Sequence, residues 1–259
     1  MSQRKRLFTL DLHGEYSPAI KSLTFPLFQH YAKKIGSTFE VITEDKFPGW
    51  PDRTNKFQVY DLIKGEPDTW AIFYDADTLV HPDMVDVTEL ISKDTVLHNA
   101  SDFAGIRWKI DAFFRRDGRN LGSCSWYQVA HSWCRDFFTP PNQQVDEIDG
   151  HLMTLEEVVS RINPTQNEAF HGMQPDHLID DFTFSRNIAR FGLKFTSIQK
   201  LSGRIMCPLS YHWHQYLLTE SEKVDRMKEV IHLWQLDGPG NCGKPTCQRC
   251  NPQPQTMGR

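Results

Sequence analysis

The segment Trp70-Ala71-Ile72-Phe73-Tyr74-Asp75-Ala76-Asp77-Thr78 joins a bulky apolar run to two carboxylates that follow it directly. The run at 70–74 is rich in aromatic and β-branched residues, which is typical of a strand buried on both faces of a parallel sheet. Residues two apart in an extended chain point the same way, so Asp75 and Asp77 can address one point. In open α/β sheets, ligands bind at the carboxyl ends of the strands. The segment therefore predicts an α/β fold with a ligand site at this strand end.

Two carboxylates in that place suit a hard divalent cation. Oxygen donors on one side of the chain are typical ligands of Mg²⁺ or Mn²⁺ that carries a substrate phosphate. The alternative is an acidic turn in which Asp77 or Asp83 caps a following helix. The buried strand before the pair weighs toward the metal site, and both interpretations stay open at this point.

The segments on either side alternate between strand and helix patterns. Ser17-Pro18 is a typical helix start, and the order strand, helix, strand that it opens implies a right-handed crossover and a parallel pair. Beyond residue 82 the pattern is looser. We expect further strands at 7–12, 39–43, 95–97, 103–106 and 194–198, and helices at 19–35, 55–64, 84–91, 126–138, 155–162 and up to Gly192.

Length and composition indicate one large soluble domain. The chain has 259 residues, of which 39% are hydrophobic and 24% charged. We place the domain at 1–237 and a tail rich in Gly, Pro, Gln and Cys at 238–259. A net charge of -4 predicts no general attraction to nucleic acid or anionic membrane. The start is too polar for a signal peptide, and no stretch approaches the roughly 20 apolar residues of a membrane span, so we expect a cytoplasmic protein.

A second group of candidate ligands is the segment Tyr211-His212-Trp213-His214-Gln215-Tyr216. If this segment is extended, His212 and His214 share a face, and one imidazole could complete the coordination of a metal held by Asp77. Packing among the aromatic neighbours is the other interpretation of the two histidines.

Two charged pairs complete the candidate site. Asp180 and Asp181 stand at a helix N-terminus, where they could cap the helix or place a carboxylate to activate an acceptor hydroxyl. Arg53 and Lys56 precede the central strand by one helix, so they could return over the same sheet edge and neutralise a diphosphate. A solvated helix face is the alternative for Lys56.

Cysteines and arginines elsewhere suggest further sites. Cys247 and Cys250 have the spacing of a zinc knuckle, and Cys242 offers a third thiolate. His232 or a distant residue would have to supply a fourth ligand, and free thiols in a flexible end are the alternative. The basic loop at 113–123 could hold an anionic acceptor, but we assign it no definite role.

Three motifs together resemble a known family. The strand end Tyr74-Asp75-Ala76-Asp77-Thr78, the upstream Arg53-x-x-Lys56 and the opening Thr9-x(6)-Tyr16 are similar to nucleotide-sugar glycosyltransferases of the GT-A fold, over roughly residues 7–216. The resemblance implies a Rossmann-type α/β fold with a mixed, mostly parallel sheet flanked by helices. It also implies that the Asp-x-Asp motif binds a divalent cation and the nucleotide-sugar diphosphate.

The resemblance further implies roles for single residues. Asp75 would contact ribose and metal, Asp77 would be a metal ligand, and His212 or His214 would complete the metal shell. The nucleoside would lie near three residues, Thr9, Asp11 and Tyr16.

On the acceptor side, the segment Ile179-Asp180-Asp181-Phe182-Thr183-Phe184-Ser185 is similar to the family's acidic motif, in which a carboxylate is the base of inverting members. The region 100–150 matches no sugar or acceptor motif.

The resulting hypothesis is a Mn²⁺- or Mg²⁺-dependent glycosyltransferase. A UDP-sugar is the expected donor, and the acceptor hydroxyl would belong to a saccharide or to a hydroxymethylated base in DNA, although the acidic net charge weighs mildly against DNA. One alternative is a nucleotidyltransferase, which would need a glycine-rich, basic phosphate loop after the first strand. The sequence Asp11-Leu12-His13-Gly14-Glu15 is a poor match to such a loop. A non-catalytic protein that binds nucleotide sugars is another alternative.

Overall fold

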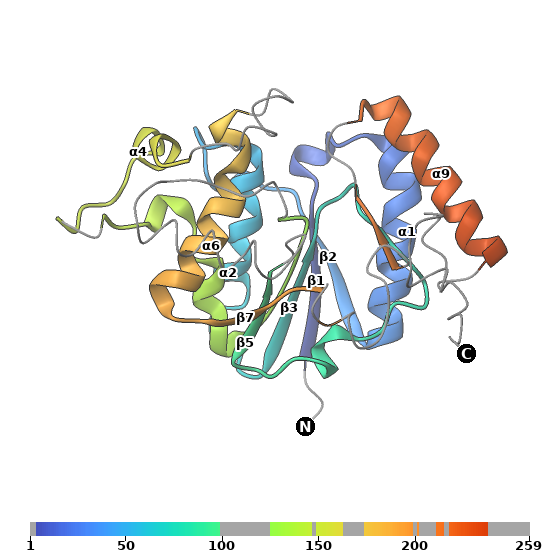
Figure 1. The fold of residues 1–259 in the computed structure, drawn as a ribbon, viewed down its shortest axis with the longest axis horizontal. Helices are drawn as coiled ribbons and strands as arrows, with labels where there is room; N and C mark the ends of the chain where they lie inside the picture. Colours follow the sequence, from blue (N-terminus) through green and yellow to red (C-terminus); the bar gives the residue numbers. More distant parts are fainter. Residues whose placement is uncertain are drawn as a thin grey trace, which may run out of the picture.

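The computed structural model describes residues 4–98, 125–146, 149–162, 174–198, 201, 211–214 and 218–237. Its centre is a six-stranded sheet with the order β2-β1-β3-β6-β5-β7 (Figure 1). Strand β6 is antiparallel to β3 and β5, and the other neighbouring pairs are parallel. The six strands are β1 Arg4–Leu10, β2 Ser37–Ile42, β3 Thr69–Tyr74, β5 Thr95–His98, β6 Tyr127–His131 and β7 Lys194–Thr196. The prediction of a mixed, mostly parallel sheet is confirmed.

Helices flank the sheet on both sides. Helices α1 and α9 lie on one side, and α2 and α6 lie on the other (Figure 1). The α-helices are α1 Pro18–Ile35, α2 Val59–Leu62, α4 Leu155–Ser160, α6 Ile179–Phe191 and α9 Glu220–Asp237. Short 3₁₀ helices are η1 Leu12–Gly14, η2 Asp52–Gln58, η3 Val87–Glu89, η4 Ser132–Phe138, η5 Pro141–Gln143 and η6 Pro175–Leu178.

The central strand β3 is buried along its whole length, as its apolar run predicts. Ala71 and Phe73 pack into the core on the α6 side, and Trp70, Ile72 and Tyr74 pack into the core on the α1 side. A strand covered on both faces leaves only its end available to a ligand. The polar residues that follow Tyr74 are therefore at the edge of the sheet that is open to a ligand.

Helix α1 connects β1 to β2 as the sequence predicts. The Ser17 side chain accepts a hydrogen bond from the Ile20 amide at 3.3 Å, and Pro18 is the first helical residue. Gly36 ends the helix in the left-handed conformation, with φ 70°. Strands β1 and β2 pair in parallel, which confirms the strand, helix, strand unit.

Several local predictions are wrong. Residues 126–138 do not form an α-helix, because Tyr127–His131 is strand β6 and Ser132–Phe138 is a 3₁₀ helix. Strand β6 bonds to β3 on one side and to β5 on the other, so tertiary pairing decides a run whose periodicity is ambiguous. The helix expected at 55–64 is divided between the 3₁₀ helix η2, up to Gln58, and α2 at Val59–Leu62. Of the segment 84–91, Val87–Glu89 is helical, and it is 3₁₀.

Helix α9 is not among the helices predicted from the sequence. This helix buries Met227 and Trp234, which pack with Ile20 of α1 and Leu79. Leu79 belongs to a small two-stranded sheet of β4 (Leu79–Val80) and β8 (His212–Trp213). In the described residues, no helix combines the length and the apolar character needed to cross a membrane.

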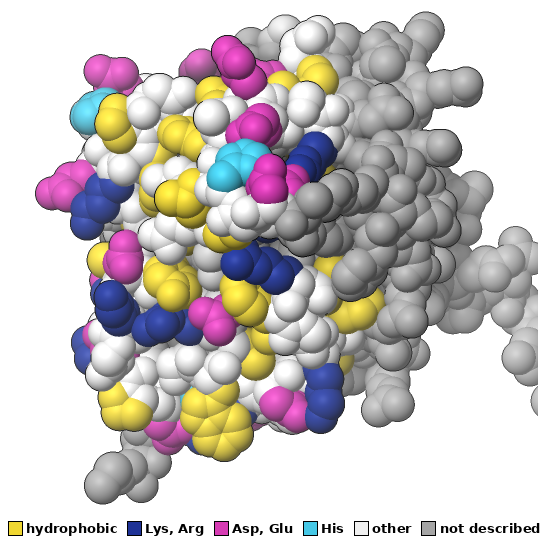
Figure 2. Space-filling view, turned by 90° about the vertical axis from the view of Figure 1, so that its left-hand side faces the viewer, with side chains coloured by type: hydrophobic (Ala, Val, Ile, Leu, Met, Phe, Trp, Pro, Cys, Tyr) yellow, Lys and Arg dark blue, Asp and Glu magenta, His cyan; other side chains and the backbone are white. Residues whose placement is uncertain are grey.

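Charges of both signs are mixed on the part of the surface that faces the viewer in Figure 2. Lys and Arg side chains alternate there with Asp and Glu and with hydrophobic groups. The predicted basic loop at 113–123, the strand expected at 103–106 and the cysteines of the tail, Cys242, Cys247 and Cys250, lie outside the described residues.

Candidate active site

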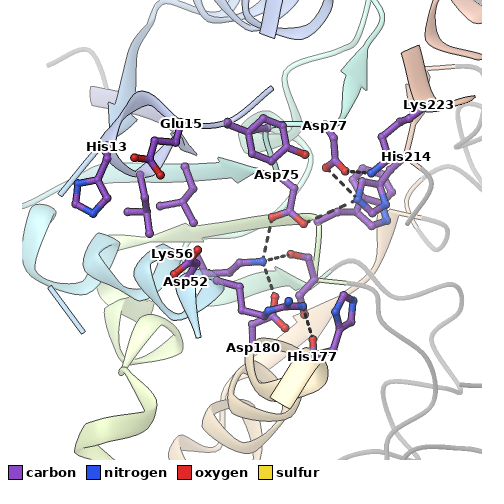
Figure 3. Close-up of a pocket in the computed structure, with 17 residues that line it drawn as sticks. His13, Glu15, Asp52, Lys56, Asp75, Asp77, His177, Asp180, His214 and Lys223 are labelled. Carbon is purple, nitrogen blue, oxygen red and sulfur yellow. Dashed lines mark hydrogen bonds and ion pairs between the residues drawn. The ribbon is translucent and has the colours of Figure 1, made fainter. Parts of the chain in front are cut away.

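A cavity of about 550 Å³ opens where β1 and β3 end (Figure 3). Its lining comes from the η1 loop, η2, the loop after β3, the residues before β6, the start of α6, the residue after β8, and α9. The volume lies in the range of small-molecule sites. The cavity is therefore where the sequence places a ligand, at the carboxyl end of the central strand.

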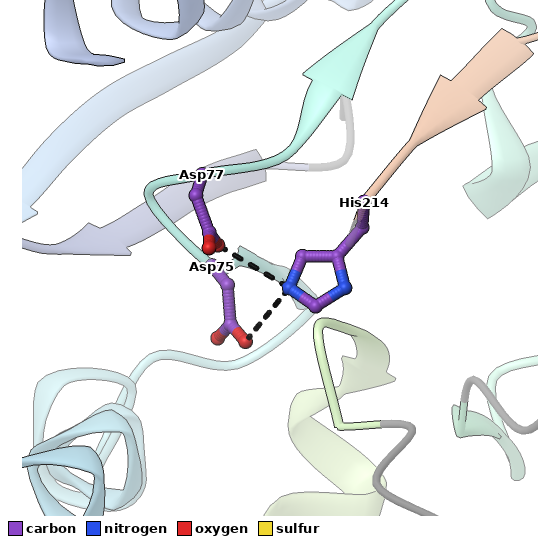
Figure 4. Close-up of side chains that lie close together, drawn as sticks. All are labelled: Asp75, Asp77 and His214. Atoms are coloured by element: carbon purple, nitrogen blue, oxygen red, sulfur yellow. Dashed lines mark ion pairs between the residues drawn. The ribbon is translucent and has the colours of Figure 1, made fainter. Parts of the chain in front are cut away.

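Two loops bring the candidate metal ligands together. After β3 the chain makes a tight turn, in which the Thr78 amide donates to the Asp75 carbonyl at 3.0 Å. Strand β8 pairs with β4 just beyond this turn, with His212 opposite Val80. This pairing returns the chain to the same point, so His214 lies beside Asp75 and Asp77 (Figure 4).

The three side chains form a compact donor set. The His214 Nε2 atom lies 3.3 Å from Oδ1 of Asp77 and 4.0 Å from Oδ2 of Asp75. One ligand atom from each residue lies within 4.8 Å of the other two, and in the described part of the chain this is the group that could hold a metal ion. Two carboxylates and an imidazole fit Mg²⁺ or Mn²⁺.

The two carboxylates have different electrostatic environments. Burial raises the pKa of Asp75, and the charges of Lys56 and His214 offset this only in part. Burial also acts to raise the pKa of Asp77, but His214 and Lys223 outweigh it and hold that pKa well below its usual range. Asp77 is therefore ionised at neutral pH, the state that a metal ligand requires.

Of the two predicted histidines, only His214 belongs to this group. The buried His212 lies with Nε2 2.8 Å from the Tyr74 hydroxyl, and its ring packs against Trp126 with centroids 5.5 Å apart. Trp126 also stacks on His214, with centroids 5.6 Å apart and an interplanar angle of 16°. The packing interpretation is thus correct for His212, and Trp126 fixes the orientation of the His214 ring.

Lys56 is buried and connects two carboxylates. Its ammonium donates to Asp75 Oδ1 at 3.0 Å, to Asp180 Oδ2 at 2.5 Å and to the Ser125 carbonyl at 2.9 Å (Figure 3). Burial acts to lower the pKa of Lys56, but the charges of Asp180 and Asp75 outweigh it and raise that pKa. The solvated-face interpretation is therefore wrong for Lys56, which is a charged residue at the bottom of the site.

The structure separates Asp180 from Asp181. Asp180 lines the cavity, and its Oδ1 atom accepts the Asp181 amide at 2.9 Å. Asp181 is fully buried and is not among the residues that line the cavity. It accepts a hydrogen bond from the Ser125 hydroxyl at 3.1 Å and lies 3.3 Å from Nε2 of His98. Only Asp180 is placed to contact a ligand.

Of the three residues expected near the nucleoside, Tyr16 lines the cavity, whereas Thr9 and Asp11 do not. Burial together with the charges of Asp77 and Asp75 raises the pKa of Tyr16. Thr9 is buried and donates to the Tyr74 carbonyl at 2.8 Å. Asp11 accepts the Tyr16 amide at 2.9 Å and the Lys21 ammonium at 2.8 Å. Thr9 and Asp11 thus shape the loop that presents Tyr16.

Arg53 lines the cavity, and its Nη1 atom donates to the His177 carbonyl at 2.8 Å. Sequence reasoning missed several lining residues, among them Ser125, Trp126, His177 and Lys223. No short spacing connects these residues to the Asp-x-Asp motif. For Lys223, the one available signal was the helical pattern of α9, whose buried positions 223, 227 and 234 share a face.

Comparison with known proteins adds little. No protein-family model and no curated protein matches the chain. One similar solved structure is that of a glycosyltransferase involved in the glycosylation of the major capsid of PBCV-1. It is 13% identical, with a TM-score of 0.44, over 87% of this chain and 99% of that chain. A likeness of this size carries no argument, so conclusions about function depend on the geometry of the site.

Proposed function

We propose that this chain is a metal-dependent glycosyltransferase that moves a sugar from a nucleoside diphosphate sugar to an acceptor hydroxyl. The observation that carries the proposal is the donor set of Asp75, Asp77 and His214 in a cavity at the carboxyl end of β3. Asp180 faces the same cavity, so a carboxylate outside the metal donor set is available to the acceptor. Ligand binding at such a strand end is the general behaviour of open α/β sheets.

Each residue has a distinct task in this proposal. A Mn²⁺ or Mg²⁺ ion held by Asp75, Asp77 and His214 would supply positive charge to the departing diphosphate. Lys56 keeps Asp75 and Asp180 in place through its two ion pairs. Asp180 orients the acceptor hydroxyl, and Tyr16 contributes to the nucleoside site together with the loop that Thr9 and Asp11 support.

The reaction exchanges one bond for another. The bond between the anomeric carbon and the diphosphate oxygen breaks, and a bond between that carbon and the acceptor oxygen forms. The acceptor hydroxyl gives its proton to Asp180, and the diphosphate leaves with the bonding electrons. UDP is the expected nucleoside diphosphate.

The loop after β1 argues against the nucleotidyltransferase alternative. That loop contains η1, with one glycine, and contributes Glu15 to the lining of the cavity. A nucleotidyltransferase would need a glycine-rich loop here that presents several backbone amides to the triphosphate. The single glycine of this loop therefore weighs against that alternative.

A panel of nucleotide sugars tests the proposal. Purified protein with Mn²⁺ is scored for release of nucleoside diphosphate, and we expect activity with at least one donor and none after chelation of the metal. Asp77→Asn should lower that activity at least about 100-fold, because a metal ligand is lost. Asp83→Asn, at an exposed position six residues on, is the matched control and should keep full activity.

An activity that survives both chelation and Asp77→Asn would refute the metal role. The non-catalytic alternative predicts binding without turnover, and calorimetry with UDP and Mn²⁺ detects such binding.

A second screen identifies the acceptor. Oligosaccharides and hydroxymethylated DNA are offered with the active donor, and the product is identified by mass spectrometry. The acidic net charge favours a saccharide over DNA.

A further inference from the structure

Lys223 brings a cation from the C-terminal helix into the metal group. Its ammonium donates to Asp77 Oδ2, whereas His214 lies beside Oδ1 of the same carboxylate (Figure 3). The side chain is largely buried, with a relative exposure of 11%. Asp77 therefore already has a cationic partner at the oxygen opposite His214.

The position of Lys223 is fixed by the packing of α9. Glu220, at the start of α9, accepts a hydrogen bond from Ser17 at the start of α1, at 2.5 Å. Further along the helix, Met227 and Trp234 pack against Ile20 and Leu79. The lysine is thus presented to Asp77 by a packed helix.

A divalent cation and this ammonium compete for one carboxylate. A metal bound by Asp75, Asp77 and His214 would lie within a few ångströms of the Lys223 ammonium, and like charges at that distance repel strongly. Lys56 cannot take over the charge of Asp77, since its donors go to Asp75, Asp180 and Ser125. Metal binding should therefore weaken the contact between Lys223 and Asp77.

We propose that Lys223 is a built-in counter-cation of the metal site. It neutralises Asp77 while no metal is bound, competes with the metal for this carboxylate, and moves to the donor's phosphates when the metal binds. The inference rests on the proposed function, because it needs both a metal and a diphosphate in this cavity. Its consequence is that metal and nucleoside diphosphate bind cooperatively: the diphosphate gives the displaced ammonium a new partner, so each ligand raises the affinity for the other.

Binding measurements test this without any turnover. Mn²⁺ is titrated into the full-length protein by calorimetry, first alone and then with saturating UDP. Lys223→Met should bind Mn²⁺ alone about tenfold more tightly than wild type, because the competing charge is gone. It should also lose the part of the UDP-induced increase in Mn²⁺ affinity that comes from Lys223, while the part that comes from the attraction between metal and diphosphate remains. Lys228→Met, at an exposed position of the same helix, is the matched control and should behave as wild type.

Further variants keep the outcomes separable. Lys223→Gln should show the same rise in Mn²⁺ affinity, and it replaces Lys223→Met if the latter does not fold. Unchanged or weaker Mn²⁺ binding by the Lys223 variants, while Asp77→Asn abolishes binding, would overturn this inference and leave the proposed metal site intact. If wild type binds no Mn²⁺, or if Asp77→Asn binds it as wild type does, the metal site and this inference both fail.

Discussion

The Lys56 ammonium lies 3.0 Å from the carboxylate of Asp75, and it also donates to Asp180 at 2.5 Å. One buried cation thus links the end of β3 to the start of α6. In the proposed reaction, this bridge connects the carboxylate of the donor side to the carboxylate of the acceptor side. The relative position of the two substrates would then depend on Lys56.

Removal of this bridge should destabilise the protein. Lys56→Met leaves the carboxylates of Asp75 and Asp180 near each other without their shared cation, and loss of one partner of a buried ion pair costs about 3–5 kcal/mol. Urea denaturation measures the free energy of unfolding. Lys64→Met, at an exposed position, is the control and should unfold as wild type. If Lys56→Met lowers the free energy of unfolding by less than about 1 kcal/mol, the ion pairs of Lys56 contribute no more than exposed ion pairs do.

The sequence was sufficient to predict the centre of the fold and of the site. The apolar run at 70–74 predicts a strand buried on both faces, and β3 is one. The spacing of Asp75 and Asp77 predicts that they address one point, and the structure brings them together with His214. These predictions depend on local periodicity, which a single sequence carries.

The remaining features depend on contacts between distant segments. Residues 127–131 become a strand because β3 and β5 bond to them on both sides, which no local pattern reveals. Lys223 reaches Asp77 across 146 positions of the sequence. His214 rather than His212 joins the metal donor set, and the His212 ring instead contacts the hydroxyl of Tyr74, 138 positions away in the sequence.

The two histidines should differ in their effect on metal binding. His214→Ala removes a ligand, so we expect a loss of Mn²⁺ affinity of at least about tenfold. His212→Phe should leave Mn²⁺ affinity unchanged and cost about 1–3 kcal/mol of stability, because the buried Tyr74 hydroxyl loses its partner. Calorimetry and urea denaturation of both variants measure the two effects. The assignment is reversed if His212→Phe is the variant that loses metal.

Asp180 and Asp181 should be separable by kinetics. Asp180→Asn should lower the rate of transfer to the acceptor about 10²–10⁴-fold, as loss of a general base does, with UDP affinity retained. Asp181→Asn should lower the rate less than tenfold, because this side chain contacts Ser125 and not the cavity. Equal losses of rate in the two variants would argue that both act through the structure of α6.

His81 should make the stability of the protein sensitive to acid. Its Nδ1 atom accepts the Asp83 amide at 2.9 Å, and its ring packs edge-on against Trp234, with centroids 4.9 Å apart. Burial lowers the pKa of His81, so the folded state favours the neutral ring. The resulting stabilisation is present above the unfolded-state pKa of about 6.5 and is lost as the pH falls through the lower folded-state pKa.

The free energy of unfolding should therefore decrease between pH 7 and pH 5, and it should decrease less in His81→Gln, which has no titrating ring. Part of the decrease should remain in the variant, because burial also lowers the pKa of His131. Urea denaturation at both pH values measures the difference. An equal decrease in wild type and variant would show that protonation of His81 is not linked to unfolding.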